Sequence, residues 1–383
     1  MMADRHRRLR RRLICGVATL SVFASACGPD NDQNSLRPEG PAAERIHGLF
    51  MPVTVVAVIV GILVLAGTVY VALRFRRRSE DEHPKQIHGS TPLEIGWTIL
   101  PALILVIIAI PTIATVFKLA EDPKGDDVLD VRVVGKQWWW QFEYPDQEVV
   151  TADELHIPVG TKVRLNLTAC DDSLGNEGTP SHCNVIHSFW VPELAGKQDV
   201  IPGREQRLTI EAEKSGTYLG QCAEYCGLSH ANMRFRVIAV DQSEFDDWIE
   251  EQQQGPAVAL TTEDAEGKEV PAGEAQELVS STFGCTGCHA FDDRKTSSYG
   301  PNLTHLASRT TFAGGTFELN RENLVDWVLD APGMIPMQSA DCRLPPPATC
   351  VGMPSFTENT PPGDPVMTRE QAETIVDYLL ALE

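Results

Sequence analysis

The middle of the chain is best interpreted from one stretch, which reads Cys222-Ala223-Glu224-Tyr225-Cys226-Gly227-Leu228-Ser229-His230-Ala231-Asn232-Met233. It places two thiols, one imidazole and one thioether on a single short segment. This soft donor set favours copper over hard cations. One thiolate would give a mononuclear site, whereas two thiolates four residues apart can bridge two copper ions. A disulfide between Cys222 and Cys226 is one alternative, and a zinc site is another, although zinc gives no role to the methionine.

The segments around this stretch alternate polar and apolar residues over short runs, as at 128–134, 162–168 and 207–212. Such alternation, bounded by turn residues, is typical of half-buried β-strands. Residues 121–250 are therefore expected to form a β-sandwich or Greek-key barrel. A second imidazole for the metal is available from His187, in the apolar run 185–190.

Several further motifs occur in order along the chain. They are residues 92–101 (Pro-Leu-Glu-Ile-Gly-Trp-Thr-Ile-Leu-Pro), 135–144 (Gly-Lys-Gln-Trp-Trp-Trp-Gln-Phe-Glu-Tyr), 187–189 and 201–204. Together with the copper loop they make residues 46–240 resemble subunit II of the haem-copper cytochrome c oxidases. The resemblance implies a cupredoxin-like fold and a binuclear copper A centre holding two copper ions. Its ligands would be the side chains of His187, Cys222, Cys226, His230 and Met233, together with the backbone carbonyl of Glu224.

The same resemblance assigns roles to two residues outside the loop. It places proton uptake at Glu94 and identifies Trp138 as the tryptophan through which electrons enter. Without the resemblance, Glu94 would be interpreted as a solvated residue at a helix start, stabilised by the helix dipole. Trp138 would be interpreted as strand packing.

The N-terminal part of the sequence predicts export and membrane anchoring. A basic cluster followed by an uncharged stretch indicates a signal peptide at residues 1–27, and Cys27 lies in a lipobox-like segment. Lipidation of Cys27, simple cleavage and an uncleaved anchor remain open. Two uncharged runs, 49–73 and 95–117, each reach the ~20 residues that a transmembrane helix needs. The arginine-rich segment 74–78 between them favours the cytoplasm. Residues 46–120 thus predict a two-pass hairpin in a bacterial membrane, with the C-terminal domains outside the cytoplasm.

A second redox module is predicted at residues 271–383, after a polar linker at 251–270. Cys285-Thr286-Gly287-Cys288-His289 matches the Cys-x-x-Cys-His signature of covalent haem c attachment, in which two thioethers fix the porphyrin and the histidine ligates iron. A thioredoxin-like or zinc site would leave His289 unexplained. Residues 300–303 and 353–356 resemble class I cytochromes c, which predicts an all-α domain. Met353 is the expected sixth ligand of the iron and Met337 the second choice. A loop methionine is otherwise a packing residue.

Composition and the remaining cysteines complete the prediction. The formal net charge of -21 repels phosphate backbones and argues against a nucleic-acid binder. Cys170 with Cys183 and Cys342 with Cys350 lie in polar or proline-rich loops, and each pair is expected to form a disulfide.

Copper and haem on one side of a membrane anchor indicate an electron relay. The resemblance implies subunit II of a caa3-type oxidase. Electrons from a cytochrome c or a cytochrome bc complex would pass through haem c and the copper pair to a partner complex. There, subunits I and III form the haem-copper oxidase that reduces oxygen and pumps protons. The alternatives are the equivalent subunit of a copper-dependent nitric oxide reductase and a non-enzymatic copper-carrying lipoprotein. Nitrous oxide reductase would need a second, histidine-rich copper site, and the intact copper loop opposes a quinol oxidase subunit.

Overall fold

The fold comes from a computed structural model, which describes residues 33–77, 79, 86, 89–123, 125, 127–169, 185–263, 267–291, 299–337, 352–357 and 365–382. Three sets of predictions lie outside these residues. They are the signal peptide with Cys27, the pair Cys170 and Cys183, and the pair Cys342 and Cys350.

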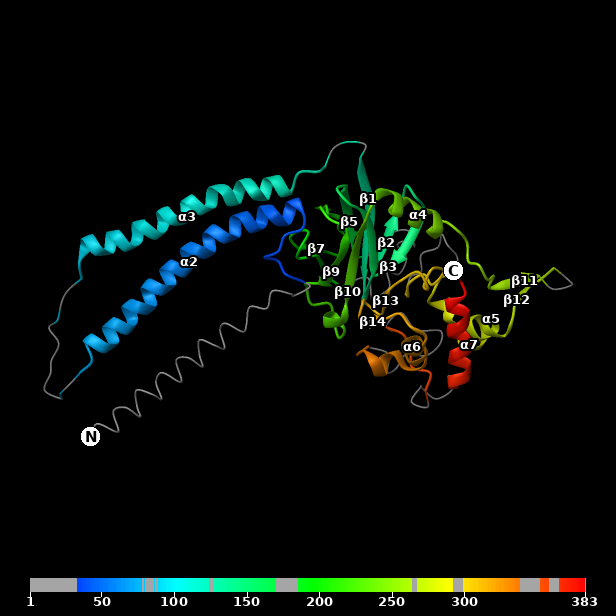
Figure 1. The fold of residues 1–383 in the computed structure, drawn as a ribbon. Coiled ribbons are helices and arrows are strands. Elements are labelled where there is room, and N and C mark those ends of the chain that lie inside the picture. Colours follow the sequence, from blue (N-terminus) through cyan, green and yellow to red (C-terminus); the bar gives the residue numbers. More distant parts are fainter. Residues whose placement is uncertain are drawn as a thin grey trace, which may run out of the picture.

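Two long apolar helices form the N-terminal part of the structure. Helix α2 spans Pro41–Arg74 and α3 spans Thr91–Leu119, and both are long and apolar enough to cross a membrane. They run side by side away from the rest of the molecule (Figure 1). Their apolar side chains are mostly exposed, which a lipid surface requires. The prediction of a two-helix transmembrane hairpin is confirmed.

Helix α2 starts earlier than the apolar run predicted, because its first turn is attached to the next domain. Pro41 fits the first helical position, where its missing N–H costs nothing. The buried Ala43 donates its backbone N–H to the Leu194 carbonyl (3.2 Å), and Glu39 donates to Glu193 (2.8 Å). The hairpin therefore leaves the folded part of the chain at a fixed place.

The next domain is a sandwich of two five-stranded sheets, as predicted. The first sheet has the order β3 (Val149–Ala152), β2 (Trp139–Tyr144), β1 (Val128–Lys136), β5 (Lys162–Thr168) and β8 (Gln206–Ile210). The second has the order β4 (Glu154–Pro158), β10 (Arg234–Val240), β9 (Gly216–Cys222), β6 (His187–Trp190) and β7 (Gln198–Val200). The pairs β1–β5 and β4–β10 are parallel.

Alternate residues of the strands face the core between the sheets. In β5 and β10 every second residue is buried, which matches the alternating sequence pattern. An aromatic cluster fills the centre: Trp140 meets Phe189 edge to face at 5.4 Å, and Phe189 stacks on Phe235 at 4.4 Å. Helix α4 (Gln242–Gln252) closes one end of the sandwich by burying Phe245 and Ile249.

The C-terminal domain lies on the side of the sandwich away from the hairpin (Figure 1). Its helical elements are α5 (Glu274–Glu277), the π-helical turn η4 (Leu278–Thr282), the 3-10 turn η5 (Cys285–Gly287), α6 (Arg321–Met334) and α7 (Arg369–Leu380). Side chains cap both longer helices: the Asn320 side chain caps α6, and Thr368 with Gln371 forms a capping box on α7.

The description of this domain as all-α needs correction. Strands β13 (Thr311–Phe312) and β14 (Phe317–Glu318) pair as a small antiparallel ribbon. Ala313, Gly314 and Gly315 between them all have positive φ (54°, 65° and 66°), a left-handed backbone that a right-handed α-helix excludes. Helices still provide most of the domain's core.

The segment 251–270, expected as a linker, also carries structure. Strands β11 (Thr261–Glu263) and β12 (Glu269–Pro271) form a second short ribbon. Val258 and Leu260 pack against the core of the C-terminal domain, and the Ala257 N–H donates to the Leu382 carbonyl (2.8 Å). These contacts tie the segment to the domain that follows it.

Candidate copper centre and haem pocket

The predicted copper ligands come from two strands of the second sheet and the loop that follows the second of them. His187 is the first residue of β6, Cys222 is the last of β9, and the pairing of β6 with β9 places Phe189 opposite Cys222. The chain then loops back through the 3-10 turn η3 (His230–Asn232) to Met233, directly before β10. The sheet therefore brings His187 to a loop that starts 35 residues later in the sequence.

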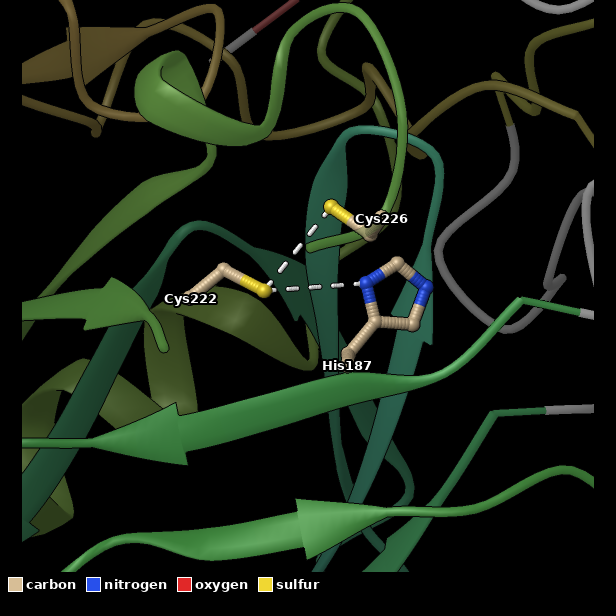
Figure 2. A group of neighbouring side chains, drawn as sticks. All are labelled: His187, Cys222 and Cys226. Carbon is tan, nitrogen blue, oxygen red and sulfur yellow. Dashed lines mark hydrogen bonds between the residues drawn. The ribbon is translucent and has the colours of Figure 1, made fainter. Parts of the chain in front are cut away.

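The donor atoms of these residues converge on one buried point. The Cys222 Sγ lies 3.8 Å from the Cys226 Sγ and 3.9 Å from the His187 Nδ1, as Figure 2 shows. Beyond the three side chains drawn, the Cys226 Sγ lies 3.6 Å from the His230 Nδ1 and 3.7 Å from the Met233 Sδ. The Glu224 carbonyl oxygen is 3.2 Å from the Cys222 Sγ. The structure brings together all six residues that the sequence indicated.

The two halves of this site are related in composition. Each sulfur has one imidazole Nδ1 near it, with His187 beside Cys222 and His230 beside Cys226. Each half is completed by one weaker donor, which is the Glu224 carbonyl on one side and the Met233 thioether on the other. This pairing suits two soft metal ions that share the two sulfurs.

Packing fixes the His187 ring before any metal is considered. The side chain is fully buried and its ring lies 5.8 Å from that of Trp140. A Cβ at Gly135 would lie 3.0 Å from the imidazole, so glycine leaves the room that the ring needs. The ligand is thus held in place by β1 and β2 of the opposite sheet.

The thiol pair is ready to carry negative charge. Hydrogen bonds from the Cys226 thiol and from His187 lower the pKa of Cys222 to about 3, despite burial. The hydrogen bond that the Cys226 thiol donates to Cys222, together with burial, raises the pKa of Cys226. A metal cation bound at this pair would favour loss of both thiol protons.

The donors fit copper better than the two alternatives. Cys222 and Cys226 are free thiols, and their 3.8 Å separation is well beyond the ~2.05 Å of a disulfide. The buried Met233 sulfur lies inside the cluster, where a Cys2His2 zinc site would have no use for it. Two thiols, two imidazoles and a thioether form the soft environment that copper prefers.

Trp138 lies directly against this site. Its side chain is nearly buried, and its indole Nε1 donates to the Cys226 carbonyl (3.0 Å). The Gln137 side-chain amide donates to the same carbonyl. Gln137 was not predicted as a site residue, because a lone glutamine before three tryptophans gives no sequence signal. The two donors fix the backbone of one predicted ligand.

A large apolar cavity adjoins the predicted haem-attachment motif. Cys285, Cys288 and His289 line it, together with Leu324 and Val328 of α6, Leu379 of α7, and Phe283 and Phe356 from outside the helices. Its empty volume, part of which is open to solvent, is about 1630 Å³. The mostly apolar lining fits a large apolar group attached at the two cysteines.

His289 has the orientation that an iron ligand requires. Its Nδ1 lies 2.9 Å from the Pro301 carbonyl oxygen, to which it can donate its proton. The Nε2 is then the nitrogen that remains for a metal, which is the usual arrangement of a ligating histidine. A Cβ at Gly300 would come within 2.5 Å of the imidazole Cε1, so glycine is needed for this close approach. The residues present fit a covalently bound haem.

Both candidate methionines line the same cavity. Met353 packs against the core of the C-terminal domain, whereas Met337 packs against the core of the sandwich and beside Gly352. Either side chain can therefore reach into the pocket.

The sandwich forms one wall of this pocket. Trp138 and Trp139 line it, and the Trp139 indole Nε1 donates to the Tyr299 carbonyl (3.1 Å). Trp138 therefore contacts the copper loop on one side and the haem cavity on the other. Glu94, by contrast, lies far from both sites, exposed in the first turn of α3.

Comparisons with known proteins agree with this architecture. The family described as cytochrome C oxidase subunit II, transmembrane domain, matches residues 34–115, and its periplasmic domain matches residues 129–240. Cytochrome c oxidase subunit 2 of Alkalihalophilus pseudofirmus is 34% identical over 369 residues, covering 95% of both chains. The chain belongs to the cytochrome c oxidase subunit II family.

Two further proteins are similar to this chain over part of its length. Cytochrome c oxidase subunit 2 of Bacillus subtilis is 33% identical over 85% of this chain and 90% of its own length. The crystal structure of the periplasmic domain of subunit II (CoxB) of Bradyrhizobium japonicum is 32% identical, covers 34% of this chain and 94% of its own, and has a TM-score of 0.29.

Membership in this family indicates the complex and the membrane topology to which these sites belong. This subunit II is a copper-binding component of a respiratory cytochrome c oxidase, a haem-copper oxidase complex. It crosses the membrane twice, and its C-terminal part lies outside the cytoplasm.

Proposed function

We propose that this subunit II is the electron relay of a caa3-type oxidase, with a binuclear copper A centre in the sandwich and a covalent haem c in the C-terminal domain. The observation that carries the proposal is the position of Trp138, which lines the haem cavity and hydrogen-bonds the backbone of Cys226. The two predicted redox sites therefore share a wall in one chain.

The copper ligands of this proposal are the six residues around the thiol pair. His187, Cys222, Cys226, His230 and Met233 would bind two ions through their side chains, and Glu224 through its carbonyl. When bound, copper supplies a one-electron carrier. The chain holds the donors in a buried, prearranged cluster, which reduces the rearrangement that each change of charge requires.

The haem site would use Cys285 and Cys288 for attachment and His289 as the proximal ligand, with Met353 as the sixth ligand and Met337 as second choice. Bound haem supplies the second one-electron carrier. Met353 is favoured because it packs with the haem domain's own core, whereas Met337 packs against the sandwich.

Electrons would pass through the two sites in one order and would involve several partner proteins. Electrons from a cytochrome c or a cytochrome bc complex would enter at the haem, pass Trp138 to the copper loop, and leave toward subunit I of the oxidase, which is accompanied by subunit III. Glu94 would serve proton uptake, because α3 begins with this carboxylate at the end of the hairpin remote from the sandwich (Figure 1).

Metal analysis of the purified full chain tests the proposal. We expect two coppers and one low-spin haem c per chain, with the electron-spin signal of one unpaired electron shared by two copper ions. Cys226→Ser should leave one copper and a mononuclear signal, because one bridging sulfur is lost, while the haem spectrum stays unchanged. Zinc in the wild-type site, or an unchanged copper signal in the variant, would reject the assignment.

A further inference from the structure

One turn of the haem domain is inserted against the copper loop. The Arg234 N–H donates to the Gly314 carbonyl (3.0 Å), and the Thr316 hydroxyl donates to the Asn232 carbonyl (3.3 Å). Asn232 and Arg234 are the residues on either side of the predicted ligand Met233. The tip of the β13–β14 ribbon therefore contacts the copper loop itself.

The contact at Gly314 is tight enough to require glycine. Its φ is positive, and a Cβ at this position would collide with the Asn232 carbonyl oxygen. The neighbouring Gly315 also has positive φ, but there a Cβ would meet its nearest atom, the Arg234 carbonyl carbon, only at 3.6 Å. Glycine thus has a role in docking at 314 and a role in the turn alone at 315.

A buried carboxylate of the sandwich holds the other end of this turn. Glu154, at the start of β4, is fully buried, and its carboxylate accepts hydrogen bonds from two haem-domain residues. The Thr311 N–H (2.9 Å) and hydroxyl (3.0 Å) donate to it, and so do the Thr310 N–H (3.0 Å) and hydroxyl. A buried carboxylate is tolerated only when such donors satisfy it, so the haem domain completes a group that the sandwich alone would leave without these partners.

Asp153 links the same turn to β2, the strand that contains Trp139 and Trp140. One carboxylate oxygen accepts from the Trp140 N–H (2.9 Å), and the other accepts from the Gly314 N–H (3.1 Å). Burial raises the pKa of Asp153 to about 7, against the opposing effects of these hydrogen bonds and of the Arg309 charge. The buried Arg309 guanidinium is a cation that interacts with both Asp153 and Glu154.

We propose that Asp153 and Glu154 of the copper domain and Thr310, Thr311 and Gly314 of the haem domain form a latch, which holds the haem pocket against Trp138 and the copper loop. Asp153 and Glu154 are positioning residues that act through the groups they bond; Asp153 also lines the haem cavity, whereas Glu154 is not among its lining residues. This inference rests on the function proposed above. A haem held by Cys285, Cys288 and His289 would give up one electron. Copper held at Cys222 and Cys226 would take up that electron, and the latch would keep the distance between the two sites constant.

The first test measures docking without measuring turnover. Hydrogen exchange, followed by mass spectrometry on the full chain with its metals, reports on the backbone N–H groups of Thr310, Thr311 and Gly314. We expect Glu154→Gln to speed exchange in this segment by about tenfold or more. The amide N–H2 of the new glutamine would face the Thr310 and Thr311 donors and could not accept hydrogen bonds from them. Glu143→Gln is the matched control. Glu143 is a partly buried acid of β2 that pairs with Arg132 (3.1 Å).

The second test measures the rate between the two centres after rapid photoreduction of the haem. Gly314→Ala should slow transfer to copper by on the order of tenfold, while both optical spectra stay as in wild type. Gly315→Ala strains the same turn without touching Asn232, so it should stay within about twofold of wild type. Gly314→Ala changes the haem domain and leaves the sequence of the copper domain intact. It therefore still tests the latch if Glu154→Gln fails to hold copper.

The outcomes separate this inference from the proposed function. Wild-type protein that lacks copper or haem would refute both the latch and the proposed function. Intact spectra in every variant, with unchanged exchange in 310–314 and unchanged transfer rates, would overturn the latch alone. Equal slowing by Gly314→Ala and Gly315→Ala would also overturn it, because the strain of the turn would then explain the effect.

Discussion

Replacement of His156 should remove a large part of the acid sensitivity of the copper domain. The residue lies on β4, and its ring stacks on Trp248 of α4, with ring centroids 4.1 Å apart and an interplanar angle of 18°. Burial lowers the pKa of His156 to about 4. The Tyr144 hydroxyl bonds only the backbone of residue 156, so His156→Phe retains both that contact and an aromatic ring on Trp248.

The sign and size of the effect follow from the two pKa values. The unfolded histidine takes up a proton near pH 6.5, whereas the folded one stays neutral until about pH 4. The stabilising contribution is therefore present above pH 6.5 and is lost as pH falls toward 4. Between pH 6.5 and 5 the gap of 1.5 units corresponds to about 2 kcal/mol of unfolding free energy.

Urea unfolding of the detergent-solubilised chain, followed by tryptophan fluorescence at pH 7 and pH 5, measures this contribution of His156 to the free energy of unfolding. A chelator first removes copper, because protonation of metal ligands would add its own pH dependence. The wild type should lose about 2 kcal/mol more than His156→Phe between the two pH values. The opposite contribution of Asp153, whose raised pKa weakens the fold as pH rises, is common to both proteins and cancels.

A second substitution separates titration from packing. His156→Gln also removes the titrating ring but fills the space differently, so it should share the flattened pH dependence of His156→Phe at a lower overall stability. Equal loss of stability in wild type and both variants would refute the reasoning.

Three further outcomes are expected. Gly220→Ala should destabilise the copper domain by ~1–3 kcal/mol in the same unfolding assay, because its Cβ would collide with the buried Phe235 ring; unchanged stability would contradict this packing. Met353→Leu should convert the low-spin haem spectrum to high spin, whereas Met337→Leu should not, and the reverse result would exchange their roles. Glu94→Gln should slow oxidase-linked proton uptake severalfold in reconstituted vesicles, with the copper and haem spectra intact; wild-type uptake would remove Glu94 from the proton path.

Local chemistry explains why several features could be predicted from the sequence. The two apolar runs at 49–73 and 95–117 indicate membrane spans because length and lack of charge alone decide burial in lipid. The copper loop supplies four donors within twelve residues, and the haem motif supplies three within five, so one turn of chain brings each set together. Thr368 and Gln371 cap α7 through contacts three residues apart.

Other features depend on segments that meet only when the sheets and domains pack. His187 reaches the copper loop through the β6–β9 pairing, which depends on strand order and not on local spacing. Met337 enters the haem cavity from a segment that packs on the other domain's core.

The contacts between the domains were invisible in the sequence for the same reason. Asp153 and Glu154 have no local motif, since their donors in the C-terminal domain lie about 160 residues later, and a side chain's partner at that separation is set by the packing of whole domains. The sequence alone determined which groups could hold metal and haem. Tertiary structure decided that the two sites share Trp138 as a wall, because only docking of one domain on the other buries these groups together.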